Sequence, residues 1–546
     1  MCGIYGVINR KVRREQAMEC LDTMIHRGPD GFGLWQEDGV TLGHRRLAIL
    51  DLSSAGSQPM SYANERYWMT FNGEIYNFIE IREELQHKGY TFRGNSDSEV
   101  IMAAYCEWKE KCVDRFNGMW TFAIWDRQEK SLFLSRDRFG VKPLYYTEFP
   151  DGGFAFASEM KALLPLLEKV EPNKEMFDRY FADNHYESQP ECLIKGIKRF
   201  PAGSYAWIRN GKTEITRFWN TLDHLIEVPD TYEEQVEQFR ELFLDACKIR
   251  MRSDVTLGTG LSGGLDSSAT ICAMSYISRN CADERANKDW QHAYVACFPG
   301  TDLDETKYAK QVTDYLGIRH TFLTIDDAVP EREFLRQLYC FEELWGNPQV
   351  PMMELYKKER ELGTTVSLDG HAADELFAGY GFDVLKAYPD AKGKAEIDQI
   401  TMAYLNQRRE MGYDPSSAEF KRQRNKLYRD YMTKYYAKKL LGRADVSSAY
   451  ADHPNWKKLD NLNKVLFVST HETILPTLLR NYDRDSMASG VEIRMPFLDY
   501  RIVEFAFSIG WKSKLHGGFY KSIVRDACAD FMPHEIAYRR TKLGFN

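Results

Sequence analysis

The sequence has no apolar run that approaches the roughly 20 residues of a membrane-spanning helix. Its amino terminus lacks the long apolar segment of a secretion signal, and its basic residues follow the short apolar start instead of preceding it. Internal repeats and low-complexity segments are also missing. We therefore expect a cytoplasmic protein that does not bind a membrane.

Paired cysteines are missing as well. The chain has 11 cysteines, an odd number, and none of them form a C-x-x-C motif, which favours reduced thiols over a disulfide framework. There is no excess of positive charge, because 72 Lys and Arg stand against 80 Asp and Glu, a formal net charge of -8. This balance argues against nucleic acid as a partner and favours small-molecule chemistry.

The length of 546 residues suggests about two to four domains. The first two hundred residues contain short strand-like runs broken by Gly, Asn and Asp, among them 40–52 and 154–157, together with helical stretches at 14–26 and 98–109. A strong hairpin signal at Asn210-Gly211 ends this region. The pattern predicts sheets covered by helices.

The second half of the chain has a different period. Apolar residues recur at helical spacing after residue 232. Strands then alternate with helices, one of which is expected to begin at Thr306, and this alternation is typical of a parallel α/β sheet. Beyond about residue 391 the pattern is mostly helical and charged. We place a first domain at 1–210, a linker at 211–231 and a second domain at 232–546.

Cys2 is the first candidate for a catalytic residue. Initiator methionine is normally removed before a small residue, so Cys2 would carry a free α-amino group beside its thiol. A thiol is a strong nucleophile, and a chain-terminal amine can act as its base. A Met-Cys start alone is usually incidental, so the assignment depends on the motifs that follow.

Four further motifs follow in order. They are His26-Arg27-Gly28-Pro29-Asp30, Arg45-Arg46-Leu47-Ala48-Ile49, Phe71-Asn72-Gly73-Glu74-Ile75-Tyr76-Asn77 and Asn95-Ser96-Asp97-Ser98-Glu99. Together with the Cys2 motif they resemble class II glutamine amidotransferases, and more specifically the glutaminase domain of asparagine synthetases. The resemblance implies an N-terminal nucleophile fold with four αββα layers.

The resemblance also implies roles in glutamine hydrolysis. Cys2 would attack the side-chain amide of glutamine, and Asn72 with the backbone N–H of Gly73 would hold the oxyanion. Arg46 would pair with the substrate α-carboxylate, and Glu74 and Asp97 would accept hydrogen bonds from its α-ammonium. Read alone, Asn72-Gly73 is a hairpin turn and Arg46 a surface charge; the company of the other motifs favours the functional reading.

A glycine- and serine-rich loop begins the second domain. Ser262-Gly263-Gly264-Leu265-Asp266-Ser267-Ser268 follows an apolar strand and precedes a helix, a context that gathers backbone N–H groups around an anion. The loop lacks the Walker A pattern. It resembles the PP-loop of N-type ATP pyrophosphatases, which implies a parallel-sheet α/β domain with a helical carboxyl-terminal part.

The PP-loop resemblance assigns further residues. ATP would be contacted by Leu261, Ser262, Gly263, Gly264, Asp266, Ser267, Ala296, Asp369 and Gly370. Asp266 and Asp374 would hold Mg²⁺, which prefers oxygen ligands. Lys542, in a basic segment that matches the family, would stabilise charge on the departing pyrophosphate. The block 487–499 also matches the family, and its apolar composition predicts core and scaffold.

His371 departs from the family pattern. Asparagine synthetases carry a glutamate at this position, near the activated aspartate, and β-lactam synthetases carry a tyrosine. A histidine there could transfer protons near neutral pH, or it could only pack. Both interpretations stay open.

The leading hypothesis is a glutamine-dependent asparagine synthetase. It would use ATP and glutamine, adenylate a carboxylate with aspartate as the leading acceptor, and pass ammonia between its domains, giving the amide, AMP, pyrophosphate and glutamate. Its partners would be small molecules and, in a homodimer, a second copy of the chain. Two alternatives remain: the same chemistry on a sugar uronic acid or peptide carboxylate, and an inactive regulatory or scaffolding homologue.

Overall fold

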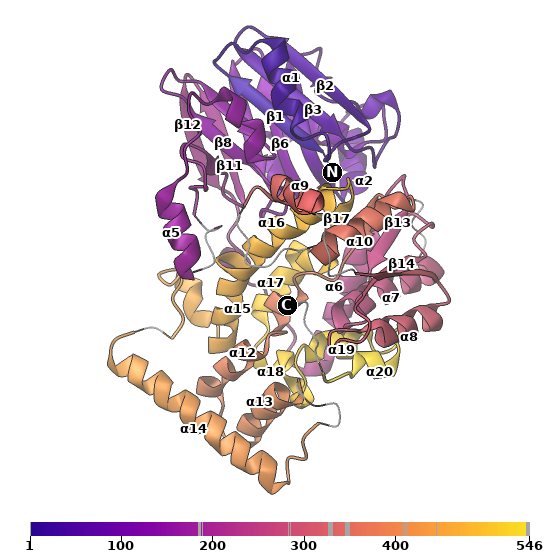
Figure 1. Cartoon of the computed structure of the whole chain (residues 1–546), viewed down its shortest axis with the longest axis vertical. Helices are drawn as coiled ribbons and strands as arrows, with labels where there is room; N and C mark the ends of the chain where they lie inside the picture. The colour runs from indigo at the N-terminus through magenta and orange to yellow at the C-terminus, as the bar shows by residue number, and fades with distance from the viewer. Residues whose placement is uncertain are drawn as a thin grey trace.

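The computed structural model describes residues 2–183, 187, 189–281, 283, 285–325, 331–343, 350–407, 409, 412–443 and 445–541. The chain forms two halves that lie against each other (Figure 1), the first built on two antiparallel sheets and the second on one parallel sheet. All 11 cysteines are free thiols, as the sequence predicts. Among the described residues, no helix is both long and apolar enough to cross a membrane.

The first half contains two six-stranded sheets. One has the order β10-β8-β9-β1-β3-β2 and the other β12-β11-β7-β6-β5-β4. The strands of the first are β1 (Gly3–Ile8), β2 (Gly31–Glu37), β3 (Val40–Arg46), β8 (Tyr145–Glu148), β9 (Phe154–Ala157) and β10 (Lys198–Arg199). Those of the second are β4 (Met60–Tyr62), β5 (Tyr67–Ile75), β6 (Gly118–Asp126), β7 (Ser131–Arg136), β11 (Ser204–Arg209) and β12 (Lys212–Arg217).

These sheets are the inner layers of a four-layer arrangement. Side chains such as Ile4 and Leu42 from one sheet and Leu134 and Ile208 from the other form a core between them. Helix α1 packs outside the first sheet, and α2 and α3 pack outside the second. The helices of this half are α1 (Arg14–Asp22), α2 (Phe78–His87), α3 (Asp97–Trp108), α4 (Cys112–Arg115) and α5 (Lys174–Asp183). This is the predicted αββα fold.

Strand β12 falls within the predicted linker. It pairs with β11 through the turn at Asn210-Gly211, where both residues have positive φ, 52° and 72°. The next helix, α6 (Tyr232–Arg250), belongs to the second half. We therefore propose a domain boundary between β12 and α6, after the hairpin instead of within it.

The second half contains a five-stranded sheet of order β15-β14-β13-β16-β17, in which every neighbouring pair is parallel. Its strands are β13 (Leu257–Gly260), β14 (His292–Cys297), β15 (Arg319–Thr324), β16 (Val366–Leu368) and β17 (Glu492–Arg494). The strand order runs from β13 to β14 and β15 on one side, and the chain then returns to place β16 and β17 on the other side of β13. The order therefore reverses between β13 and β16. Ligands of open α/β sheets bind beyond the carboxyl ends of strands at such a point.

Helices surround this sheet and form the rest of the second half. Helices α7 (Leu265–Asn280), α8 (Thr306–Leu316), α10 (Val350–Glu361) and α16 (Ile474–Met487) pack on its strands. Helices α6, α9 (Glu331–Phe341), α19 (Ser522–Cys528) and α20 (His534–Ala537) pack on those helices. The others are α11 (Ala373–Phe377), α12 (Gly381–Val384), α13 (Lys394–Asn406), α14 (Ala418–Leu440), α15 (Asn461–His471), α17 (Tyr500–Ser508) and α18 (Trp511–Lys514). The predicted parallel sheet with a helical carboxyl-terminal part is confirmed.

Candidate active sites

Cys2 lies at the start of β1, where the two halves meet. Its backbone N–H donates to Oδ1 of Asn72 at 2.9 Å, and its thiol lies 3.8 Å from the carbonyl oxygen of Leu47. Burial raises the pKa of the Cys2 thiol above its usual value. The thiol therefore needs a base to become a nucleophile, and the α-amine of the same residue could serve as that base in a chain from which Met1 has been removed.

Asn72 and Gly73 lie in β5, beside Cys2. Asn72 is fully buried, and its Nδ2 has no hydrogen-bond partner among the described residues. A buried amide without a partner costs about 1–3 kcal/mol, so this donor favours an incoming oxygen. Gly73 has φ of +154°, and a Cβ there would lie 2.1 Å from the carbonyl oxygen of Met119, so only glycine fits.

The residues predicted to bind the α-carboxylate and the α-ammonium of glutamine differ in their surroundings. Arg46 is half-buried, and its guanidinium donates to the carbonyl oxygens of Asp51 and Ser53, which fix its direction. Glu74 and Asp97 are buried carboxyls, and Oδ2 of Asp97 accepts from the N–H of Ile75 at 2.9 Å. Burial raises the pKa of Asp97 to about 7, and burial with repulsion from Glu492 raises that of Glu74.

The PP-loop lies beyond the carboxyl end of β13 and leads into α7. Oγ of Ser262 accepts from the N–H of Gly264 at 3.1 Å and lies 3.1 Å from Oγ of Ser267. Gly263 has φ of +76°, and an added Cβ would lie 2.4 Å from the backbone nitrogen of Ala309 in α8. The loop is therefore folded tightly against its neighbour, with its backbone directed to the start of α7.

Asp266 and Asp374, the predicted metal ligands, converge on one cation. Nζ of Lys521 lies 2.5 Å from a carboxylate oxygen of each. Lys521 is almost fully buried; burial disfavours its charge, but Asp266 and Asp374 outweigh burial and raise its pKa. Two carboxylates brought together around an ammonium group fit a divalent cation that completes its shell with water and phosphate oxygens.

Asp369 and His371 form the next wall, beyond the end of β16. Asp369 is buried and accepts from the N–H of Gly260 at 3.0 Å and from the hydroxyl of Tyr356 at 2.7 Å. His371 is half-buried and stacks on Tyr482 of α16, with ring centroids 3.6 Å apart. Its Nε2 lies 3.5 Å from Oδ2 of Asp369. The imidazole is thus held between a carboxylate and a phenol ring.

These elements enclose a cavity of about 810 Å³. Of the predicted ATP and metal residues, those that line it are Leu261, Ser262, Gly264, Asp266, Ser267, Ala296, Asp369, Gly370 and Asp374. Gly263, which belongs to the same loop, packs against α8. His371 and Lys521 also line the cavity. The residues predicted from the PP-loop therefore surround one space large enough for a nucleotide.

One predicted residue is not described by the structure, and sequence reasoning missed the contacts of two others. Lys542 lies outside the described residues. Lys521, the cation between the two carboxylates, has no local sequence signal. Arg27 also bridges the halves: its Nε donates to the carbonyl oxygen of Cys2 at 3.1 Å, and its fork binds Asp483 of α16 at 2.7 and 2.9 Å. The motif that contains Arg27 was recognised, but its partner lies 456 residues away.

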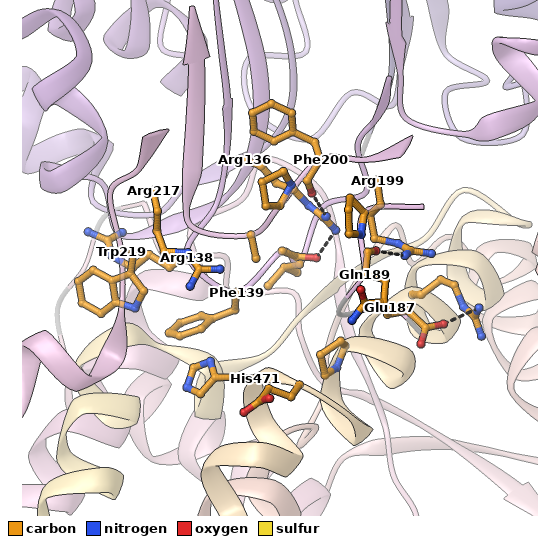
Figure 2. A pocket seen from close by; sticks show the side chains of 18 of the residues that line it. Arg136, Arg138, Phe139, Glu187, Gln189, Arg199, Phe200, Arg217, Trp219 and His471 are labelled. Atoms are coloured by element: carbon orange, nitrogen blue, oxygen red, sulfur yellow. Dashed lines mark hydrogen bonds and ion pairs between the residues drawn. The ribbon is translucent and has the colours of Figure 1, made fainter. Parts of the chain in front are cut away.

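A second cavity, of about 570 Å³, lies between the halves (Figure 2). Its first wall carries Arg136, whose guanidinium donates to the carbonyl oxygens of Lys142, Phe200 and Gly140. The opposite wall carries His471, whose burial lowers its pKa to about 3 and leaves it neutral at pH 7. None of the predicted site residues that the structure describes lines this cavity. Arg136 therefore organises the loop after β7, away from both candidate sites.

Comparisons with known proteins agree along the whole chain. A family model for a glutamine amidotransferase domain matches residues 1–219, and one for asparagine synthase matches residues 238–546. Glutamine-hydrolyzing asparagine synthetase 1 of Bacillus subtilis (strain 168) is 30% identical, covering 100% of this chain and 87% of that protein. Asparagine synthetase 3 of the same organism is 32% identical, with 99% and 86% covered. Asparagine synthetase B of Escherichia coli (strain K12) is 28% identical, with 99% and 81% covered.

Proposed function

This chain belongs to the glutamine-hydrolysing asparagine synthetases, which are ATP-dependent ligases, and from that premise we propose that it amidates aspartate with ammonia taken from glutamine. The observation that carries the proposal is the convergence of Asp266 and Asp374 on Lys521 beside the PP-loop. Such a cluster suits the splitting of ATP into AMP and pyrophosphate.

Glutamine hydrolysis is assigned to the first half. The Cys2 thiol gives its proton to its own α-amine and attacks the amide carbon of glutamine. Nδ2 of Asn72 then donates to the oxyanion, because this N–H group has no hydrogen-bond partner among the described residues. Ammonia leaves with the transferred proton, and water releases glutamate from the thioester.

Carboxylate activation is assigned to the second half. The β-carboxylate of aspartate attacks the α-phosphorus of ATP, and pyrophosphate leaves with its charge met by Lys521. Asp266 and Asp374 would hold Mg²⁺, which when bound neutralises phosphate oxygens. Ammonia attacks the acyl-adenylate carbon, AMP leaves, the attacking nitrogen loses a proton to solvent, and asparagine forms. We assign the pyrophosphate cation to Lys521 because it is buried between the two carboxylates.

Because the two reactions are assigned to separate sites, a single substitution should stop one reaction and leave the other. We expect Cys2→Ala to abolish glutamate release from glutamine but to retain asparagine formation from ammonium, aspartate and ATP. Lys521→Gln should do the reverse, lowering ATP turnover by at least ~10² while glutamine hydrolysis continues. Lys512→Gln, which changes an exposed lysine paired with Glu396, is the matched control.

Product analysis decides the acceptor and the nucleotide chemistry. Glutamine, ATP and a panel of carboxylic acids would be incubated with the parent chain, and the nucleotide products separated by chromatography. We expect AMP and pyrophosphate in step with asparagine. ADP as the stoichiometric product, or amidation of another acid in preference to aspartate, would contradict the proposal.

A further inference from the structure

Strand β17 reaches from the second half into the glutamine site. Its sequence, Glu492-Ile493-Arg494, lies in the block that composition assigns to scaffold, and β17 forms the edge of the parallel sheet next to β16. Nη2 of Arg494 lies 3.5 Å from Oε2 of Glu74, across the interface. Figure 1 shows the amino terminus at the same junction. A residue of the synthetase half therefore contacts the carboxyl predicted to bind the glutamine ammonium.

The other end of Arg494 contacts the nucleotide site. Its backbone carbonyl oxygen accepts from the N–H of Asp369 at 2.9 Å, and Leu368 is its register partner in β16. Asp369 in turn lines the nucleotide cavity beside His371. One residue thus contacts the glutamine-binding carboxyl through its side chain and the nucleotide-binding loop through its backbone.

Arg494 is held rigidly between these contacts. It is fully buried, its Nη1 donates to the carbonyl oxygens of Arg250 and Arg252 at 2.8 and 2.6 Å, and its Nε donates to Glu492 at 2.8 Å. A side chain with so many partners has few alternative positions. A change in its attraction to Glu74 would therefore act on the backbone of β17 instead of being absorbed by side-chain motion.

The charges around Arg494 give glutamine a means of changing that attraction. Glu74, Asp97 and Glu492 are all buried, and burial, together with repulsion from Glu492, raises the pKa values of Glu74 and Asp97. An ammonium group arriving at Glu74 would add a second positive charge beside this carboxyl, next to that of Arg494. Glutamine would therefore change the attraction between Glu74 and Arg494.

We propose that Arg494 is a positioning residue that couples occupancy of the glutamine site to occupancy of the nucleotide site. This inference rests on the proposed function, because it takes Glu74 and Asp369 as parts of the two sites. Thermodynamic linkage requires the coupling to be reciprocal: ATP must change glutamine affinity by the same factor as glutamine changes ATP affinity.

The test measures that factor directly. In a Cys2→Ala background, which prevents turnover, calorimetry would give glutamine affinity with and without ATP, and ATP affinity with and without glutamine. We expect a coupling of about fivefold or more, the lower end of typical values. Arg494→Lys keeps the charge but loses the fork, and should reduce the coupling to less than about twofold.

Arg252→Lys is the matched control. Arg252 is also a buried interface arginine, and it pairs with Glu80 of the first half at 2.7 Å without contacting Glu74. We expect it to retain the parent coupling. If Arg494→Lys does not fold, Glu492→Gln removes the carboxylate that anchors Nε and gives the same readout.

The outcomes separate the inference from the proposed function. Two ligands that bind independently in the Cys2→Ala background, or an unchanged coupling factor in Arg494→Lys, would overturn the role of Arg494 and leave the proposed reaction intact. A chain that binds neither glutamine nor ATP would overturn the proposed function itself.

Discussion

At the scale of single residues, neighbours determine chemistry more than residue type does. Lys521 and Lys512 are separated by nine positions, yet one is buried between two carboxylates and the other is exposed beside Glu396. His471 and His371 differ in the same way: burial drives His471 to its neutral form, whereas His371 lies in the nucleotide cavity beside Asp369. Function follows from these surroundings.

His371 allows a prediction at this scale. Because its ring stacks on Tyr482 and is held near Asp369, we expect it to position the acceptor without transferring a proton. His371→Ala should then lower ammonia-dependent turnover by less than about tenfold, below the ~10²–10⁴ of general acid–base catalysis. Tyr482→Leu, which removes the stack, should have a similar effect.

Two results would bear against this prediction. A loss of ~10² or more in His371→Ala, with Tyr482→Leu unaffected, would show that the imidazole transfers a proton. His371→Glu tests the acceptor in the same assay, since it restores the residue of the family pattern. Improved amidation of aspartate in that variant would show that the natural acceptor is another acid.

At the scale of elements, the PP-loop depends on its packing as much as on its glycine content. Gly263 and Gly317 both have positive φ, 76° and 66°, where an L-residue is strained by roughly 1–2 kcal/mol. A Cβ at Gly317 meets nothing within 4 Å, whereas at Gly263 it meets the backbone of α8. An L-residue would be strained at both positions, but only at Gly263 would its Cβ also clash with a neighbouring backbone.

Alanine substitution separates these contributions. We expect Gly317→Ala to lower stability slightly and to leave ATP affinity unchanged. Gly263→Ala should displace the loop from α8 and weaken ATP binding by about tenfold or more, the equivalent of about 1.4 kcal/mol. The KM for ATP in ammonia-dependent synthesis, together with thermal unfolding, would measure both effects. Equal effects of the two variants would show that the contact with α8 does not shape the loop.

At the scale of the whole molecule, a buried ion-pair network joins the two halves. Arg27 holds the carbonyl of Cys2 and binds Asp483 of α16, next to Tyr482, which stacks on His371. Asp30 and Arg360 form a second pair across the interface, at 3.3 Å, with about a third of each side chain exposed. Burial distinguishes the energetic importance of these two pairs.

Charge-neutral substitutions test that distinction. Asp483→Asn should destabilise the chain by about 3 kcal/mol, because it leaves a buried guanidinium short of one carboxylate. It should also slow glutamine hydrolysis, although Asp483 lies in the other half. Asp30→Asn, in the exposed pair, should cost less than about 1 kcal/mol. Denaturant unfolding and glutamate release would measure these effects, and equal destabilisation by both would contradict the role assigned to burial.

Local patterns were sufficient to predict most elements. Helix α8 begins at Thr306, strand β9 spans Phe154–Ala157, and the Asn210-Gly211 turn joins β11 to β12, all as the sequence indicates. Predicted boundaries were wrong where contacts of individual residues end a strand earlier than its apolar pattern does. The strand expected over 40–52 ends at Arg46, because the chain then turns to bring the carbonyl of Leu47 to Cys2 and those of Asp51 and Ser53 to Arg46.

The sequence by itself determined the two-part architecture, the nucleophile motif and the PP-loop, because each is written in contiguous residues with a fixed backbone requirement. Only the tertiary structure decided that Lys521 joins Asp266 to Asp374, that Arg27 meets Asp483, and that Arg494 meets Glu74. These partners come from segments far apart in the chain. Their pairing depends on how sheets and helices pack, and no local sequence pattern records that packing.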